Sequence, residues 1–307
     1  MNRFGWNLRY PGPTSFPGMI LWAADTARGP MVVPGTYTVR LTADGRVQRQ
    51  SFTVRTDPRV RGVSQADLQR RFDFAMQIRN RTSQANDAVL LIRGVRQQVE
   101  ERRGRTQDAE VRQAADSLLA RIAVIEERLY QVRNQSNQDP LNYPIRLNNK
   151  LAALMNHVEE AESAPTEQSY QVFQELSTQL DRELGALNAI WTQELEAFNR
   201  LLRTRRLPPV TRTPLVVSED GDAGTPTDVN IAAQRALDDR CAGQRRAVEF
   251  GLDHPGQRPI GVDEGLLCRR AALLRQEVHQ DAGKGQQGQH RHRRQQADER
   301  DKVPGSA

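Results

Sequence analysis

Residues 111–132 read VRQAADSLLARIAVIEERLYQV, and this stretch decides the fold of the 307-residue chain. Its apolar side chains recur at alternating steps of four and three residues, at Val111, Ala115, Leu118, Ile122, Ile125, Leu129 and Val132. That spacing places them along one face of an α-helix, as in the seam through which helices pack. We predict a helix whose seam is buried either in the chain's own core or against a missing domain or a second subunit.

Three more apolar stripes with helical spacing accompany this seam. The first, over residues 68–99, follows a capping-box pattern that begins at Ser64. The others cover residues 147–161 and 173–202. Because four amphipathic helices with short connections pack side by side, we predict an antiparallel four-helix bundle over residues 64–206.

The first 58 residues have the patterns of β-strands rather than helices. Four segments fit strands, at residues 4–10, 19–24, 37–41 and 52–54. A glycine turn at residues 43–45 joins the last two as a hairpin. A complete immunoglobulin-like sandwich needs about seven strands. We therefore predict a partial Ig-like β-sandwich over residues 1–58, with further strands before Met1, and a fold class that is α+β but mostly α.

The last hundred residues differ in composition from the rest. Of the sixteen aromatic residues only Phe250 lies after Leu207, whereas both cysteines and four of the five histidines do. A segment with one aromatic ring has little with which to build a core. We predict that residues 208–307 form a low-complexity, disordered tail, which is either natural or the product of GC-rich DNA read in a shifted frame.

Two blocks of sequence resemble a known family. The first block contains NRF at residues 2–4, LRYP at 8–11, FPGMILWA at 16–23 and PGTYTVRL at 34–41. The second contains YQVRNQSNQDPLN at residues 130–142 and LNNKL at 147–151. Over residues 2–207, the chain resembles the C-terminal region of large bacterial secreted proteins with sortilin-like (BNR-repeat) β-propellers, which are often labelled glycosyl hydrolases.

The resemblance implies an accessory region and not the propeller itself. In that family the propeller precedes this region and a signal peptide precedes the propeller, so the full-length relatives look secreted or periplasmic. A glycan or a peptide would then bind through the propeller, and no catalytic residue carries over to this chain. Because the chain as given starts without a signal peptide, cytoplasmic is the default expectation for it.

No residue pattern amounts to a catalytic, cofactor or metal site. The string GKGQQG at residues 283–288 matches a dinucleotide fingerprint but lacks the strand before it and the helix after it. His290 and His292 have no cysteine or carboxylate cluster to complete a set of four ligands. His157 with Glu160, one helical turn apart, fits an exposed and solvated helix face.

The charge of the chain does not indicate a nucleic-acid or membrane protein. The net charge is +6, and its arginines are interspersed with acids along the predicted helices, which is typical of solvated faces. No apolar stretch reaches the ~18 residues that a membrane span needs.

Two groups of residues are the candidate interaction sites. One group is aromatic and would contact the missing strands or the propeller: Phe4, Trp6, Phe16 and Trp22. The other lies in an asparagine-rich loop: Asn134, Asn137, Asn142, Asn148 and Asn149. Asparagine side chains cap helices and bond loop backbones, and they also hold glycans or neighbouring domains.

Three functions are compatible with these patterns. The first is a non-catalytic accessory region that packs against, or presents, a sortilin-like propeller. The second is part of a glycosyl hydrolase whose catalytic portion is missing here. A glycosidase site needs two carboxylates about 5–9 Å apart across a sugar cleft. The third is a helical self-association module that uses the seam at residues 111–132.

Overall fold

The computed structural model describes residues 5–43, 46–215 and 248–253. The chain divides into two units, Met1–Phe250 and Gly251–Ala307, and the helices and the hairpin described below belong to the first. Its described part is mostly helical, with a two-stranded antiparallel hairpin followed by four helices. The predicted order, a β region and then helices, is confirmed.

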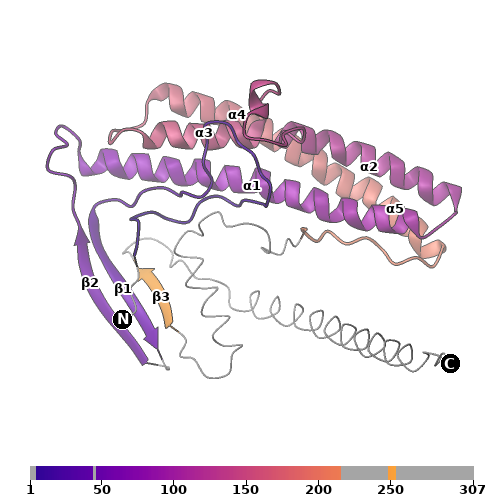
Figure 1. Cartoon of the computed structure of the whole chain (residues 1–307), viewed down its shortest axis with the longest axis horizontal. Helices are drawn as coiled ribbons and strands as arrows, with labels where there is room; N and C mark the ends of the chain where they lie inside the picture. The colour runs from indigo at the N-terminus through magenta and orange to yellow at the C-terminus, as the bar shows by residue number, and fades with distance from the viewer. Residues whose placement is uncertain (1–4, 44–45, 216–247, 254–307) are drawn as a thin grey trace, which may run out of the picture. The chain divides into compact units, whose positions relative to one another are not determined.

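The helices begin and end close to the predicted stripes (Figure 1). They are α1 (Gln65–Gly104), α2 (Ala109–Leu129), α3 (Leu147–Glu159) and α4 (Glu167–Ile190), which continues through a π-helical turn, η2 (Trp191–Leu195), into α5 (Glu196–Thr204). A short 3₁₀ turn, η1 (Asp139–Leu141), lies in the connection between α2 and α3.

The four helices do not lie side by side, so the predicted arrangement of the bundle is wrong. Because α1 has 40 residues and α2 and α3 have only 21 and 13, the two short helices lie end to end along the long one (Figure 1). Glu126 of α2 bonds Arg93 of α1, whereas Asn148 of α3 bonds Asn86, nearer to the start of α1. The α2–α3 pair therefore packs against both long helices, α1 and α4–α5.

The seam of α2 is part of the core that these helices enclose. Six of its side chains are at most 4% exposed: Val111, Ala115, Leu118, Ile122, Ile125 and Leu129. Val132 lies beyond the end of α2 and is 39% exposed. The seam is internal to the chain, so it is not a free surface for a second subunit.

Carboxylates cap the starts of the first two helices. Asp67 Oδ2 accepts from Ser64 N and Asp67 N donates to Ser64 Oγ, so the predicted capping box is confirmed. At α2, Asp108 accepts from Val111 N at 3.1 Å and from Arg205 Nε at 2.6 Å. The bond from Arg205, followed by that from Val111, lowers the pKa of the Asp108 carboxyl.

This lowered pKa predicts an acid-dependent loss of stability. A carboxyl whose pKa is lower in the folded chain stabilises the fold above the unfolded value of about 3.9, and the contribution is lost as pH falls through the folded pKa. Asp108→Asn keeps a capping side chain without the charge. We expect it to destabilise the protein at pH 7 and progressively less below about pH 4. Urea unfolding across this range measures the difference, and a difference that does not vary with pH would contradict the charge effect.

Strands β1 (Gly35–Ala43) and β2 (Arg46–Val54) form the predicted hairpin. They pair along their full length, from Gly35 opposite Val54 to Ala43 opposite Arg46. A third strand, β3 (Val248–Asp253), lies next to β1, so the sheet order is β2-β1-β3. A strand therefore occurs at a place where a disordered tail was predicted.

The two other predicted strands are wrong. Residues 5–34, which we call the N-terminal segment, contain no strand and only one isolated bridge, between Arg9 and Met31. A partial Ig-like sandwich is therefore not formed by the described part of residues 1–58. The alternating apolar side chains face different neighbours instead of one shared layer: Trp6 packs on the hairpin and Tyr10 packs on α1.

Packing against the helices continues past the predicted end of the bundle. Val210 is 3% exposed, and its N–H and C=O both bond the side chain of Asn199 in α5, at 2.7 and 2.9 Å. Leu215 N donates to Leu90 O of α1 at 3.0 Å. The predicted tail therefore starts too early. Several residues weighed in the sequence lie outside the described ones: Cys241, Cys268, residues 283–288, His290 and His292.

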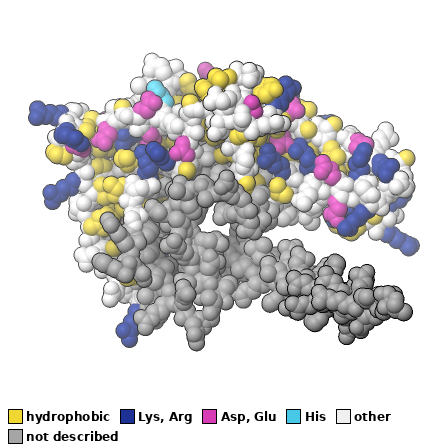
Figure 2. All heavy atoms as spheres, viewed as in Figure 1, with side chains coloured by type: hydrophobic (Ala, Val, Ile, Leu, Met, Phe, Trp, Pro, Cys, Tyr) yellow, Lys and Arg dark blue, Asp and Glu magenta, His cyan; other side chains and the backbone are white. Residues whose placement is uncertain are grey.

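The helical surface has the charge pattern expected from the sequence. On the face shown in Figure 2, basic and acidic side chains are interspersed over the helices. His157 and Glu160 are 66% and 76% exposed, as predicted for a solvated face. In the described ranges, no helix combines the length and the apolar character needed to cross a membrane.

Candidate functional site

The N-terminal segment is where residues from both candidate groups come together. It runs over the helices as a loop before it enters β1 (indigo in Figure 1). The two ends of the loop are joined by backbone bonds, from Tyr10 N to Pro30 O and from Val32 N to Leu8 O, both at 2.9 Å. The segment is thus closed at its base and held against the helices.

An ion pair fastens the base of this loop to the end of α3. Arg9 Nη1 donates to Glu159 Oε2 at 2.5 Å and to Gly29 O at 2.9 Å. Met31 N donates to the same carboxylate oxygen at 3.1 Å. The Glu159 side chain is 9% exposed, so loss of Arg9 would leave a poorly solvated charge behind.

Asparagine side chains hold the middle of the loop. Asn149 of α3 accepts from Trp22 N at 2.7 Å and donates to Trp22 O at 2.8 Å, so one amide pairs with both backbone groups of one residue. Asn148 donates to Asn86 at 3.0 Å, and Asn86 donates to Thr14 O at 2.6 Å. A segment without a strand partner thus obtains its backbone hydrogen bonds from side chains.

The structure divides the five predicted asparagines. Asn148 and Asn149 are 1% and 3% exposed; Asn149 bonds the loop directly and Asn148 bonds Asn86, which bonds the loop. Both therefore have the structural role, the first of the two alternatives. Asn137 and Asn142 are exposed on the connection between α2 and α3, and Asn134 is partly buried. The five do not form one site, and the exposed pair keeps the alternative of a glycan or a neighbouring domain.

We expect Asn149→Ala to lower the free energy of unfolding by about 1–3 kcal/mol, because it leaves two backbone groups of Trp22 without their partner. The matched control is Asn137→Ala, which removes an exposed amide and should stay within about 0.5 kcal/mol of the wild type. Urea unfolding measures both variants, and hydrogen exchange at the Trp22 amide reports the local release. Equal losses in the two variants would contradict the role of Asn149.

Phe16 is a core residue and not a docking residue, so its predicted role is wrong. It is 5% exposed, and its ring meets Tyr130 edge-on at 5.1 Å. The guanidinium of Arg93 lies over both rings, at 4.6 Å from Phe16 and 5.4 Å from Tyr130. Tyr130 also accepts a hydrogen bond from Ile20 N at 3.1 Å. Phe16 therefore anchors the N-terminal segment in the helical core.

The other aromatic candidates differ from one another in exposure. Trp6 meets the rings of Tyr37 and Phe52 at 5.7 and 6.0 Å, so it joins the N-terminal segment to the hairpin. Trp22 is 39% exposed although its backbone is fixed by an asparagine. Phe4 lies outside the described residues. Of the candidates that the structure describes, Trp22 is the one presented to solvent.

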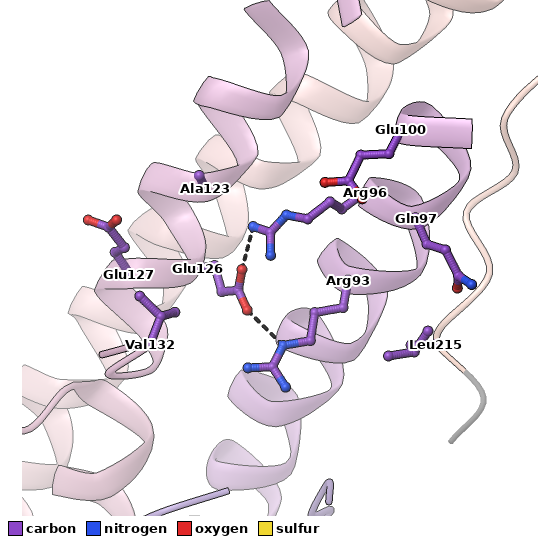
Figure 3. A pocket seen from close by; sticks show the side chains of 9 residues that line it. All are labelled: Arg93, Arg96, Gln97, Glu100, Ala123, Glu126, Glu127, Val132 and Leu215. Carbon is purple, nitrogen blue, oxygen red and sulfur yellow. Dashed lines mark hydrogen bonds and ion pairs between the residues drawn. The ribbon is translucent and has the colours of Figure 1, made fainter. Parts of the chain in front are cut away.

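A cavity of about 540 Å³ opens between α1 and α2, on the side where the chain reaches Leu215 (Figure 3). Glu126, which lines it, is 2% exposed and accepts from Arg93 Nε at 2.7 Å and from Arg96 Nη2 at 2.5 Å. Each carboxylate oxygen faces its own guanidinium, as the dashed lines in Figure 3 show. A carboxylate held in this way ties two helices together and is not free to act as a general base.

None of these three charged residues is among the residues that the sequence patterns single out. A partial signal exists, since Arg93 and Arg96 lie one helical turn apart and Glu126 is next to a seam position. However, arginine and glutamate at such positions are common on solvated helices. Their contact depends on how α1 meets α2, which the spacing within one helix does not specify.

No protein-family model, curated protein or solved structure matches this chain. Among the residues placed by the structure, no three histidine, cysteine, aspartate or glutamate side chains gather into a group that could hold a metal ion. The most buried carboxylates of the site, Glu126 and Glu159, pair with arginines.

Proposed function

We propose that this chain is a non-catalytic accessory region that packs against, or presents, a β-propeller of the sortilin-like type. The observation that carries the proposal is the uncovered hairpin. Residues 46–51 of β2 are all exposed, and Val47 is 51% exposed. Within the described part of the chain, the extensive contacts of β1 are with β2, and neither strand packs extensively on a helix.

Tyr37 anchors the hairpin near its base. Tyr37 is 3% exposed and donates its hydroxyl hydrogen to Val33 O at 2.6 Å. Burial raises the pKa of Tyr37 to about 12, so this donor stays protonated at neutral pH. An isolated two-stranded hairpin is at best marginally stable in water, and here β3 adds a third strand on the β1 side only. A partner that covers the strands would stabilise them, and strands supplied by that partner would extend the sheet.

The N-terminal segment supports the same proposal. The two sequence blocks that resemble the propeller proteins meet in space, where Ile20 bonds Tyr130 and Trp22 bonds Asn149. The resembling residues thus build one structural unit. The partly exposed ring of Trp22 is one of the apolar side chains that this unit presents to a partner, together with Leu8 and Leu141.

Neither alternative function has a supporting observation of its own. The seam that self-association would use is internal core. A hydrolase site needs two carboxylates across a cleft, and Glu126, the buried acid of the cavity, is paired with two arginines. On this proposal a hydrolase activity belongs to the propeller and not to this chain.

The test is to titrate this protein with a purified sortilin-like β-propeller domain and to follow its backbone amides by NMR. Domains that are linked in one chain meet at effective concentrations of about 1 mM, so the titration should reach that range. We expect shift changes in residues 46–54 and at the Trp22 indole. No change at about 1 mM would overturn the proposal.

Two exposed valines provide a matched pair of variants for this titration. Val47 lies on the hairpin and Val172 on α4, and they are 51% and 43% exposed. We expect Val47→Asp to abolish the shift changes and Val172→Asp to leave them intact. Binding that survives both variants would place the contact away from the hairpin.

A further inference from the structure

The hairpin carries an unbalanced charge. From residue 35 to residue 54 the sequence has three arginines and one acid, Asp44. Arg40 of β1 lies directly opposite Arg49 of β2 in the strand register, and like charges in that position destabilise a sheet. Arg40 Nε is also buried without a hydrogen-bond partner among the atoms that the structure describes. The hairpin therefore favours an acidic neighbour.

Among the described strands, β2 has no neighbour on its outer edge. In the order β2-β1-β3, β1 has a neighbour on both sides and β2 has a neighbour on one side. An unpaired edge offers a row of N–H and C=O groups to another extended chain. Because residues 46–51 are exposed, most of β2 is accessible to such a chain.

We propose that the free edge of β2 binds an extended, acidic segment of another polypeptide, which adds to the sheet as a further strand. The added backbone pairs with the edge N–H and C=O groups, and its carboxylates pair with Arg46 on one face of the sheet and with Arg49 on the other. The inference deepens the proposed function by naming the chemistry of the partner, and it rests on that function only in using the same hairpin.

Charge and hydrogen bonding together select this occupant over others. A second copy of the chain would bring its own basic β2 against the same arginines, which is repulsive. A nucleic acid or an acidic glycan supplies charge but no row of backbone amides. The strand on the other side of the hairpin has the proposed chemistry in its sequence, VEFGLD, with an acid at its second and sixth positions.

The first experiment uses a capped octapeptide in which pairs of valines alternate with pairs of glutamates, so that an added strand carries carboxylates on both faces; it is added to the full chain. We expect slower hydrogen exchange at alternate amides of residues 46–54 and weaker binding as salt is raised. One matched peptide replaces glutamate by lysine. Another keeps every glutamate but replaces two central valines by proline, which removes the N–H donors. Both should bind at least about tenfold more weakly.

The second experiment uses variants whose side chains are exposed, so that the fold is retained. We expect the double variant Arg46→Gln and Arg49→Gln to weaken binding of the valine–glutamate peptide by about three- to tenfold. Arg182→Gln on α4, where the side chain is 73% exposed, is the matched control and should bind as the wild type does.

Several outcomes would overturn strand addition. They are equal binding of the proline peptide, equal binding of a single-stranded oligonucleotide of the same charge, and protection from hydrogen exchange that appears outside residues 46–54.

The experiments also distinguish a failure of strand addition from a failure of the proposed function. Peptide binding without propeller binding would leave strand addition standing and remove the propeller as the partner, whereas propeller binding without peptide binding would do the reverse.

Discussion

Phe16→Ala is expected to lower the free energy of unfolding by about 3–5 kcal/mol, the usual cost of removing a buried phenylalanine side chain. Phe16 is 5% exposed and packs against Tyr130 beneath Arg93. Its loss opens a cavity in the helical core and removes the anchor of the N-terminal segment. We therefore expect faster hydrogen exchange at Ile20, whose amide bonds Tyr130, together with the drop in global stability seen by urea unfolding.

Trp22→Ala is the matched aromatic truncation. Trp22 is 39% exposed, and the bonds from Asn149 reach its backbone and not its ring, so they survive the substitution. We expect a loss of less than about 1 kcal/mol, in keeping with surface positions. Similar losses at the two positions would mean that Phe16 is not a core residue or that the Trp22 ring is more deeply packed than the structure shows.

Gly94→Ala is expected to destabilise the protein by about 1–3 kcal/mol, the usual range for inserting atoms into a packed contact. A Cβ atom at Gly94 in α1 would lie 2.1 Å from Thr213 O and 2.7 Å from Leu215 N. Both are backbone atoms, so the segment at residues 208–215 has to move. We expect the bond from Leu215 N to Leu90 O to be lost, which hydrogen exchange at Leu215 detects.

Gly185→Ala makes the same change in another helix and is expected to have the opposite sign. A Cβ atom at Gly185 in α4 meets nothing within 4 Å. Alanine at an exposed helical position should therefore stabilise the protein by about 0.5–1 kcal/mol relative to glycine. A stabilising Gly94→Ala variant would show that residues 208–215 do not pack on α1 in solution.

The elements that the sequence predicts well are those that depend on neighbours a few residues apart. The helical stripes, the capping box at Ser64 and the pairing of the two hairpin strands are all confirmed. In each case the apolar spacing or the capping partner lies within about one or two turns of the chain. The burial of the α2 seam follows from the same spacing.

The predicted strands at residues 4–10 and 19–24 show where this approach fails. Alternation reports that successive side chains face opposite sides, but it does not report whether a strand lies alongside to pair with. In this protein the helices take that place, and Asn149 and Asn86 supply the backbone hydrogen bonds that a neighbouring strand would supply. No pattern within the N-terminal segment specifies partners that lie 72 and 127 residues away.

The sequence by itself determined the helices, the hairpin and the faces that they bury, because these follow from local spacing and local hydrogen bonds. The tertiary structure decided the rest. In it α2 and α3 lie end to end along α1, Phe16 is buried while Trp22 is exposed, and Glu126 is held between two arginines. These outcomes depend on which surfaces meet across long stretches of chain. The physical reason is that burial and ion pairing are properties of two surfaces in contact, whereas a periodic pattern describes only one of them.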